Sequence, residues 1–191
     1  MRLGIGLPNF LTLIRICLIP ICVVIFYLPF SSAHYLAGLI FALACVTDWL
    51  DGFFARKLKE VSLFGAFFDP VADKLLVSSC LLMLVGSEGL HYITLPAIVI
   101  VGREIVISAL REWMAEIGKR ASIAVSYVAK IKTTMQMVAI FLLITCKNSA
   151  DWAGIAGNFL LYLASILTIW SMAVYLRIAW PELTKKTERT G

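Results

Sequence analysis

The sequence contains few charged residues and very little histidine. Charged side chains make up 15% of the 191 residues, whereas a soluble domain has about 25%. The two histidines, His34 and His91, fall in short connections between apolar segments, which argues against a catalytic role for either. The five cysteines lie in or beside apolar runs without metal-type spacing, so we expect them to pack in the core rather than form disulfides.

Apolar residues dominate what is present. The hydrophobic fraction is 61% and the mean hydropathy is +0.91, values typical of a membrane protein that crosses the bilayer several times. Six apolar runs occur, several of them reaching the span length of about 20 residues only when neighbouring charged residues are included. We therefore predict an all-α fold with six transmembrane helices in one domain, residues 1–191. The runs are residues 11–30, 35–50, 75–85, 93–107, 137–145 and 155–175.

The distribution of lysine and arginine predicts the orientation in the membrane. Basic residues occur near the N-terminus, at 56–59, at 119–120 and in the C-terminal tail, and they are missing from 31–34 and 86–91. Because basic connections stay in the cytoplasm, we expect both termini and the connections at 56–59 and 119–120 to be cytoplasmic. The net charge of +5 would then form a rim suited to anionic lipid. Nucleic acid is a poor partner because no soluble basic domain is present to hold it.

Four aspartates stand out in this apolar sequence because an ionised carboxylate in a bilayer is costly. Asp48 and Asp51 are three residues apart, and Asp69 and Asp73 are four apart, so each pair shares one face of a helix. Two helices can therefore offer two carboxylates each to one polar cavity near the cytoplasmic side. Oxygen ligands without histidine or cysteine favour Mg²⁺ or Mn²⁺, and two such ions would balance four carboxylates.

Other interpretations of the aspartates remain open from the residues alone. The carboxylates could form buried ion pairs with Arg56, Lys57 and Lys74, or they could line a cation pathway as in ion-coupled transporters. Pro70, directly after Asp69, cannot donate a helical hydrogen bond. The third helix is therefore expected either to begin near Asp69 or to be kinked there.

The aspartates belong to a longer motif, D-x2-D-G-x2-A-R-x8-G-x3-D-x3-D, which residues 48–73 match without a departure. This motif resembles the signature of the CDP-alcohol phosphatidyltransferase family, membrane enzymes with six transmembrane helices. Residues 8–15, 107–120 and 130–136 also resemble the bacterial branch that uses glycerol 3-phosphate, so the resemblance covers essentially the whole chain.

The resemblance implies a reaction in which an acceptor hydroxyl attacks the β-phosphorus of CDP-diacylglycerol and CMP leaves. It implies divalent metal bound by the four aspartates, with Asp73 also acting as general base. It further implies a homodimer in the bacterial inner (cytoplasmic) membrane, with an active site that faces the cytoplasm. The residues implied to contact CDP-diacylglycerol are Asn9, Thr12, Asp51, Gly52, Arg56 and Gly65.

The acceptor has to be chosen by residues outside the motif. Several cations on the predicted first, fourth and fifth helices can converge on the cytoplasmic cavity, which suits a phosphorylated acceptor. Glycerol 3-phosphate is therefore favoured, as the resemblance also implies, while an inositol phosphate or serine remains an alternative. Arg103 could instead pair with Glu104 or with an aspartate. The candidate residues for the acceptor phosphate are Arg15, Arg103, Arg111, Lys130 and Lys132.

Overall fold

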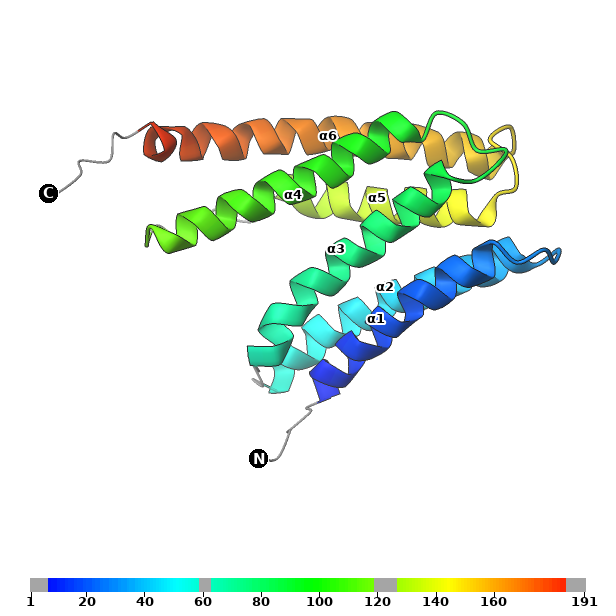
Figure 1. Ribbon diagram of the computed structural model, residues 1–191, viewed down its shortest axis with the longest axis horizontal. Helices are drawn as coiled ribbons and strands as arrows, with labels where there is room; N and C mark the ends of the chain where they lie inside the picture. The colour runs from blue at the N-terminus through cyan, green and yellow to red at the C-terminus, as the bar shows by residue number, and fades with distance from the viewer. Residues whose placement is uncertain (1–6, 59–62, 119–126, 185–191) are drawn as a thin grey trace, which may run out of the picture.

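The computed structural model describes residues 7–58, 63–118 and 127–184, and in these ranges the chain is all α-helical (Figure 1). The predicted fold class is thus confirmed. The helices are α1 (Leu7–Phe26), α2 (Ala33–Leu58), α3 (Leu63–Val85), α4 (Thr94–Glu116), α5 (Tyr127–Thr145) and α6 (Trp152–Leu183).

Helices α2 to α6 are longer than the apolar runs that predicted them, whereas α1 is as long as its run and begins four residues earlier. Within the described ranges, α1, α2 and α6 each contain a segment long and apolar enough to cross a membrane, and α5 contains a shorter one over Ile131–Thr145. The count of six spans therefore stays a prediction. Helix α3 begins at Leu63 and continues through Pro70, so of the two alternatives a start near Asp69 was wrong, and a kink at Pro70 stays a prediction.

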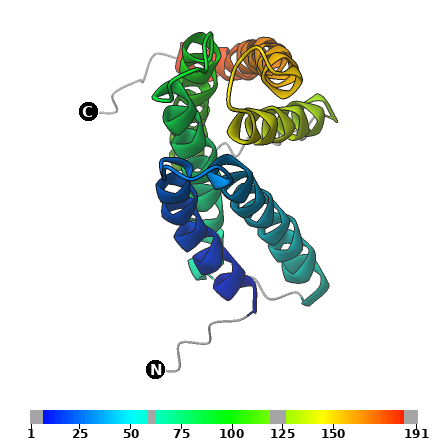
Figure 2. The same cartoon turned by 90° about the vertical axis from the view of Figure 1, so that its right-hand side faces the viewer.

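The helices form two groups that meet along α3 and α5. Helix α1 packs against α2 and α3, while α6 packs against α5 and α4, and contacts of α2 with α5 and of α3 with α4 join the groups. The first residues of α1 and the last residues of α2, α4 and α6 lie at one end of the molecule, at the left in Figure 1. The α1–α2, α3–α4 and α5–α6 connections lie at the other end, as Figure 2 also shows.

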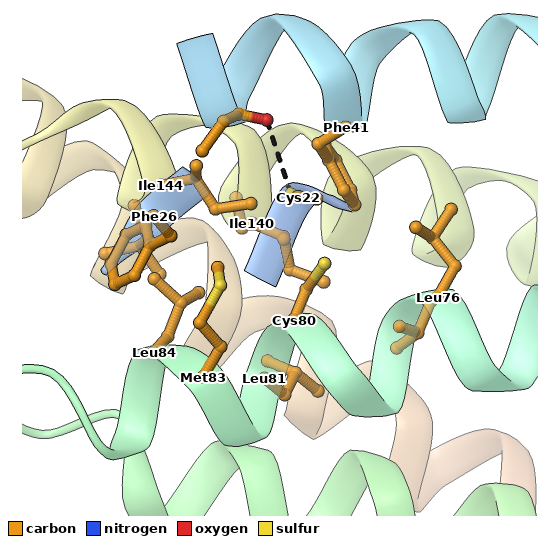
Figure 3. Close-up of a cluster of buried hydrophobic side chains, with 14 of the residues drawn as sticks. Cys22, Phe26, Phe41, Leu76, Cys80, Leu81, Met83, Leu84, Ile140 and Ile144 are labelled. Carbon is orange, nitrogen blue, oxygen red and sulfur yellow. Dashed lines mark hydrogen bonds between the residues drawn. The ribbon is translucent and has the colours of Figure 1, made fainter. Parts of the chain in front are cut away.

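The hydrophobic core occupies the half of the bundle next to those three connections. Phe26, Phe41, Leu81 and Ile144 from four different helices meet there, and the Cys22 thiol donates to the Ala37 carbonyl oxygen at 3.4 Å (Figure 3). All five cysteines are free, as expected from their apolar surroundings.

In the described part of the chain, buried polar residues lie in the opposite half of the bundle, toward the first residues of α1 and the last residues of α2, α4 and α6. On each helix that carries such residues, they lie closer to this end of the bundle than any residue of the hydrophobic core on the same helix. The bundle therefore has an apolar half and a polar half along its length. The buried polar residues are Asn9, Thr12, Arg15, Asp51, Arg103, Lys132, Gln136, Ser165, Thr168 and Ser171.

The α3–α4 and α5–α6 connections fasten the apolar end together. The Ser149 amide donates to the Gly89 carbonyl oxygen at 3.0 Å, and the Ser149 hydroxyl accepts from the His91 amide at 2.7 Å. Gly154, in the first turn of α6, lies against this connection, because a Cβ there would be 2.5 Å from the Asn148 carbonyl oxygen and 2.8 Å from the Ser149 Cα. The approach of backbone to backbone leaves room only for glycine.

We expect Gly154→Ala to destabilise the protein, because the added methyl group meets backbone atoms that cannot turn away. The cost should be about 1–3 kcal/mol, seen as a fall of several degrees in Tm. Gly102→Ala on α4 is the matched control, since a Cβ there meets nothing within 4 Å and alanine favours a helix over glycine. Equal Tm values for the two variants would contradict this account of the α5–α6 connection.

Candidate active site

Arg15 is the centre of the polar half. Its side chain, on α1, is fully buried, and its Nη1 lies 2.8 Å from Asp48 Oδ1 on α2 and 2.7 Å from Asp73 Oδ1 on α3. Its Nη2 lies 3.8 Å from Asp51 Oδ2. One guanidinium thus contacts three of the four motif aspartates and joins α1, α2 and α3. Sequence reasoning had assigned Arg15 to the acceptor phosphate and had not predicted these ion pairs.

Thr12 brings the remaining aspartate into the same cluster. Its hydroxyl oxygen lies 2.8 Å from Asp51 Oδ2 and 2.6 Å from Asp69 Oδ1. A hydroxyl has a single proton to donate, so it serves only one of the two carboxylates at a time. The aspartates are therefore arranged as two pairs, each made across α2 and α3: Asp48 with Asp73 at Arg15, and Asp51 with Asp69 at Thr12.

The four carboxylates differ in their access to solvent. The Asp51 side chain is 3% exposed, whereas those of Asp48 and Asp73 are 46% and 50% exposed. Asp51 is thus held inside the helix contact, while Asp48 and Asp73 border the open side of the cluster. A group that exchanges protons with a bound molecule has to be reachable, which excludes the buried Asp51 and leaves Asp48, Asp73 and the partly exposed Asp69.

The ligand atoms of the aspartate cluster can be compared with those that a divalent metal prefers. Among the described residues, no three histidine, cysteine or acidic side chains lie close enough to hold one ion in this arrangement. The donors are nevertheless all oxygens, as Mg²⁺ and Mn²⁺ require. Within the described part of the chain, the buried Asp51 Oδ1 has no hydrogen-bond partner, so this oxygen is free to act as a ligand. The residues present fit a hard cation.

Some predicted donor-site residues can be placed only in part. Asn9 is buried on the first turn of α1, one helical turn before Thr12, and Gly65 is buried near the start of α3. Gly52 and Arg56 lie on α2, but their side chains fall outside the part that the structure describes.

A second polar cluster lies on α4, α5 and α6. Arg103 Nη1 on α4 donates to Glu104 Oε1 at 2.9 Å, and Lys132 Nζ on α5 lies 3.7 Å from the same oxygen. Arg103 and Lys132 are both buried, and in the described ranges Arg103 Nε has no hydrogen-bond partner. The pairing of Arg103 with Glu104 was one of the two alternatives predicted, and here it occurs together with convergence on Lys132.

Tyr175 on α6 organises the arginines of this cluster. The guanidinium carbons of Arg103 and Arg111 lie 5.8 and 5.6 Å from the centre of its ring, which is within cation–π range. Arg111 Nη2 donates to the Tyr175 hydroxyl at 3.3 Å, and Arg103 Nη2 donates to Ser171 Oγ at 3.4 Å. Three cations and one carboxylate give this cluster a net positive charge. The side chain of Lys130, also predicted here, lies outside the described part.

The sequence analysis does not identify Ser171 and Tyr175, because residues 155–175 form an apolar run typical of a span that faces lipid. A signal was present. Hydroxyl-bearing residues recur at Ser165, Thr168, Ser171 and Tyr175, spacings of three and four that place them on one helix face. A polar stripe on an otherwise apolar helix indicates a face turned toward a polar interior rather than toward lipid.

Comparison with known proteins gives consistent relatives. The sequence pattern of the CDP-alcohol phosphatidyltransferase family matches residues 5–173. The CDP-diacylglycerol–glycerol-3-phosphate 3-phosphatidyltransferase of Haemophilus influenzae is 53% identical over 174 residues, which are 91% of this chain and 93% of the relative. Proteins of the same name are 51% identical in Pectobacterium atrosepticum and 49% in Escherichia coli, each over 93% of this chain and 97% of the relative.

The family match extends over nearly all of the chain, and the four motif aspartates meet Arg15 and Thr12 in one cluster at the interface of α1, α2 and α3. The protein therefore belongs to the CDP-alcohol phosphatidyltransferase family.

Proposed function

We propose that this protein transfers the phosphatidyl group of CDP-diacylglycerol to the hydroxyl of sn-glycerol 3-phosphate, giving phosphatidylglycerophosphate and CMP. The observation that carries this proposal is the presence of two polar clusters of opposite charge in the same half of the bundle. One holds four carboxylates on α2 and α3, and the other holds Arg103, Arg111 and Lys132 on α4 and α5. The names of the relatives specify the same donor and acceptor.

Asp48, Asp51, Asp69 and Asp73 would hold Mg²⁺ or Mn²⁺, two ions by charge balance. Such ions, when bound, neutralise the diphosphate of the donor and stabilise the departing CMP. The carboxylate oxygens and the unpartnered Asp51 Oδ1 support this assignment. The chain itself contributes the positions of the carboxylates, which Arg15 and Thr12 hold across three helices.

Asp73 is the proposed general base. Its carboxylate is half exposed, so an acceptor hydroxyl can reach it. The hydroxyl oxygen attacks the β-phosphorus and forms a new P–O bond, while its proton passes to Asp73. The bond between the β-phosphorus and the bridging oxygen breaks, and CMP leaves with that electron pair. Asp48 has similar exposure, and the motif resemblance is what favours Asp73.

The cationic cluster suits the phosphate of the acceptor. Arginine donates several hydrogen bonds to a phosphate in a fixed geometry, and the buried Arg103 has an unpartnered Nε in the described ranges. Glu104 contacts both Arg103 and Lys132, and the Tyr175 ring lies against both Arg103 and Arg111, so these two residues hold the cations in one cluster. Serine would not need three cations at this position, so the cluster favours a phosphorylated acceptor.

The protein is proposed to lie in the bacterial cytoplasmic membrane as a multi-pass homodimer, with both clusters open to the cytoplasm. The apolar surface of α1, α2 and α6 supports the membrane location, because only about a third of each span window is buried in the bundle. The positions of lysine and arginine in the sequence support the orientation. The homodimer rests on the family resemblance.

Asp73→Asn should lower the rate of CMP release by about 10²–10⁴-fold and retain binding of CDP-diacylglycerol, because the amide cannot accept the hydroxyl proton. CMP release and nucleotide-lipid binding are measured separately on purified protein. Asp151→Asn, before the first residue of α6 at the far end, is the matched control and should be near wild type. Near-normal turnover by Asp73→Asn would remove Asp73 from the role of base.

Removal of divalent metal should abolish CMP release. EDTA-treated protein with both substrates is expected to be inactive, because nothing then neutralises the donor diphosphate, and added Mg²⁺ or Mn²⁺ should restore the rate. Full activity in excess EDTA would rule out the metal requirement, and the family assignment would stand.

Lys132→Gln should raise KM for glycerol 3-phosphate about tenfold or more, since a hydrogen bond to a charged group contributes about 1.5–3 kcal/mol. KM for CDP-diacylglycerol should change little. Lys147→Gln, exposed in the α5–α6 connection, serves as the control. An unchanged KM for glycerol 3-phosphate, or equal wild-type rates with serine as acceptor, would contradict the assignment of this cluster to the acceptor phosphate.

A further inference from the structure

Arg15 is a cation that lies among the carboxylates proposed to bind metal, and metal binding by those carboxylates does not itself require it. It is fully buried, and its Nη1 lies between Asp48 Oδ1 and Asp73 Oδ1 at 2.8 and 2.7 Å. A cation that uses those same oxygens as ligands has to share them with the guanidinium or displace it. Arg15 and a divalent metal are therefore in competition for Asp48 and Asp73.

The charges of the cluster indicate why a resident cation is present. Four ionised carboxylates in the low-dielectric interior of a membrane protein repel one another strongly. Arg15 reduces their net charge from −4 to −3, two divalent ions would bring it to +1, and a net positive site attracts an anionic diphosphate. Without Arg15, the same two ions would only neutralise the carboxylates. Arg15 thus stabilises the metal-free cluster and changes the charge of the loaded one.

The hydrogen bonding of Arg15 is incomplete in this arrangement. Within the part of the chain that the structure describes, its Nε and Nη2 have no hydrogen-bond partner although they are buried, and Nη2 is 3.8 Å from Asp51 Oδ2. A guanidinium that served only as a permanent scaffold would be expected to use its five donors fully. These two buried nitrogens without hydrogen-bond partners indicate that Arg15 has other partners in another state of the site, such as the metal-bound state.

We propose that Arg15 is a positioning residue that acts as the counter-ion of the aspartate cluster before metal binds, and that it gives up Asp48 and Asp73 when a divalent cation arrives. The inference rests on the metal site of the proposed function. It predicts the direction in which metal affinity changes when Arg15 is replaced. If Arg15 competes with metal, its removal tightens metal binding. If Arg15 instead preorganises the carboxylates for metal, its removal weakens metal binding.

The test measures Mn²⁺ binding directly, without turnover. Purified protein in detergent is titrated with Mn²⁺, and free Mn²⁺ is followed by its electron paramagnetic resonance signal. Arg15→Gln should bind Mn²⁺ about tenfold more tightly than wild type and should have a lower Tm in EDTA, with the Tm difference reduced by Mn²⁺. Arg15→Lys keeps the positive charge and should bind within about threefold of wild type. Arg177→Gln, the same change at an exposed position on α6, should match wild type.

Each outcome decides between the accounts. Unchanged or weaker Mn²⁺ binding by Arg15→Gln, with normal binding by wild type, overturns the role of Arg15 and leaves the proposed metal site intact. Absence of Mn²⁺ binding in all variants overturns both. Should Arg15→Gln fail to fold even with Mn²⁺, a crystal structure of the wild-type protein with Mn²⁺ gives the answer. Arg15 Nη1 more than 4 Å from Asp48 and Asp73 supports displacement, and retention of both contacts beside bound Mn²⁺ overturns it.

Discussion

The contact between the Arg15 guanidinium and the carboxylates of α2 and α3 is the interaction on which the polar half of this protein depends. The hydrophobic core ends one helical turn away, at Ile19 on α1 and Leu76 on α3, so apolar packing does not hold the helices together at that level. Removing one partner of a buried ion pair typically costs about 3–5 kcal/mol, because the other charge is left uncompensated. The charged residues of the proposed active site therefore also hold α1, α2 and α3 together at this level of the bundle.

This dependence explains the division of the bundle into two halves. The apolar half holds the helices in place through the core and the fastened connections at Gly89 and Ser149. The polar half can then contain buried charge without having to supply most of the stability. A substrate with acyl chains and a charged headgroup matches such a division, since its chains stay in lipid while its headgroup enters at the polar end.

The sequence was sufficient for the helices and for the membership of the aspartate cluster, because helical spacing alone places Asp48 with Asp51 and Asp69 with Asp73. It was not sufficient for the pairing across helices, in which Asp48 meets Asp73 and Asp51 meets Asp69. That pairing depends on how α2 packs against α3, which no local pattern specifies. For the same reason the ion pairs of Arg15 with Asp48 and Asp73 could not be predicted from the sequence. Pro70 left two alternatives for α3, and the one that the structure excludes is a start near Asp69, because the helix runs from Leu63 through Pro70.

The opposite charges of the two clusters also constrain how an acceptor can lie in the proposed reaction. The carboxylates repel a phosphate, whereas Arg103, Arg111 and Lys132 attract it, so the phosphate of glycerol 3-phosphate belongs with α4 and α5. In that proposal the free hydroxyl at the other end of the three-carbon chain would have to reach Asp73 on α3, whose side chain is half exposed. Helices α3 and α4 contact each other, and they diverge from their connection toward the polar end (Figure 1). In the proposed reaction, the charges of the two clusters would thus orient the acceptor, with its phosphate at the cations and its hydroxyl toward the carboxylates. Its carbon chain would then need no specific contact.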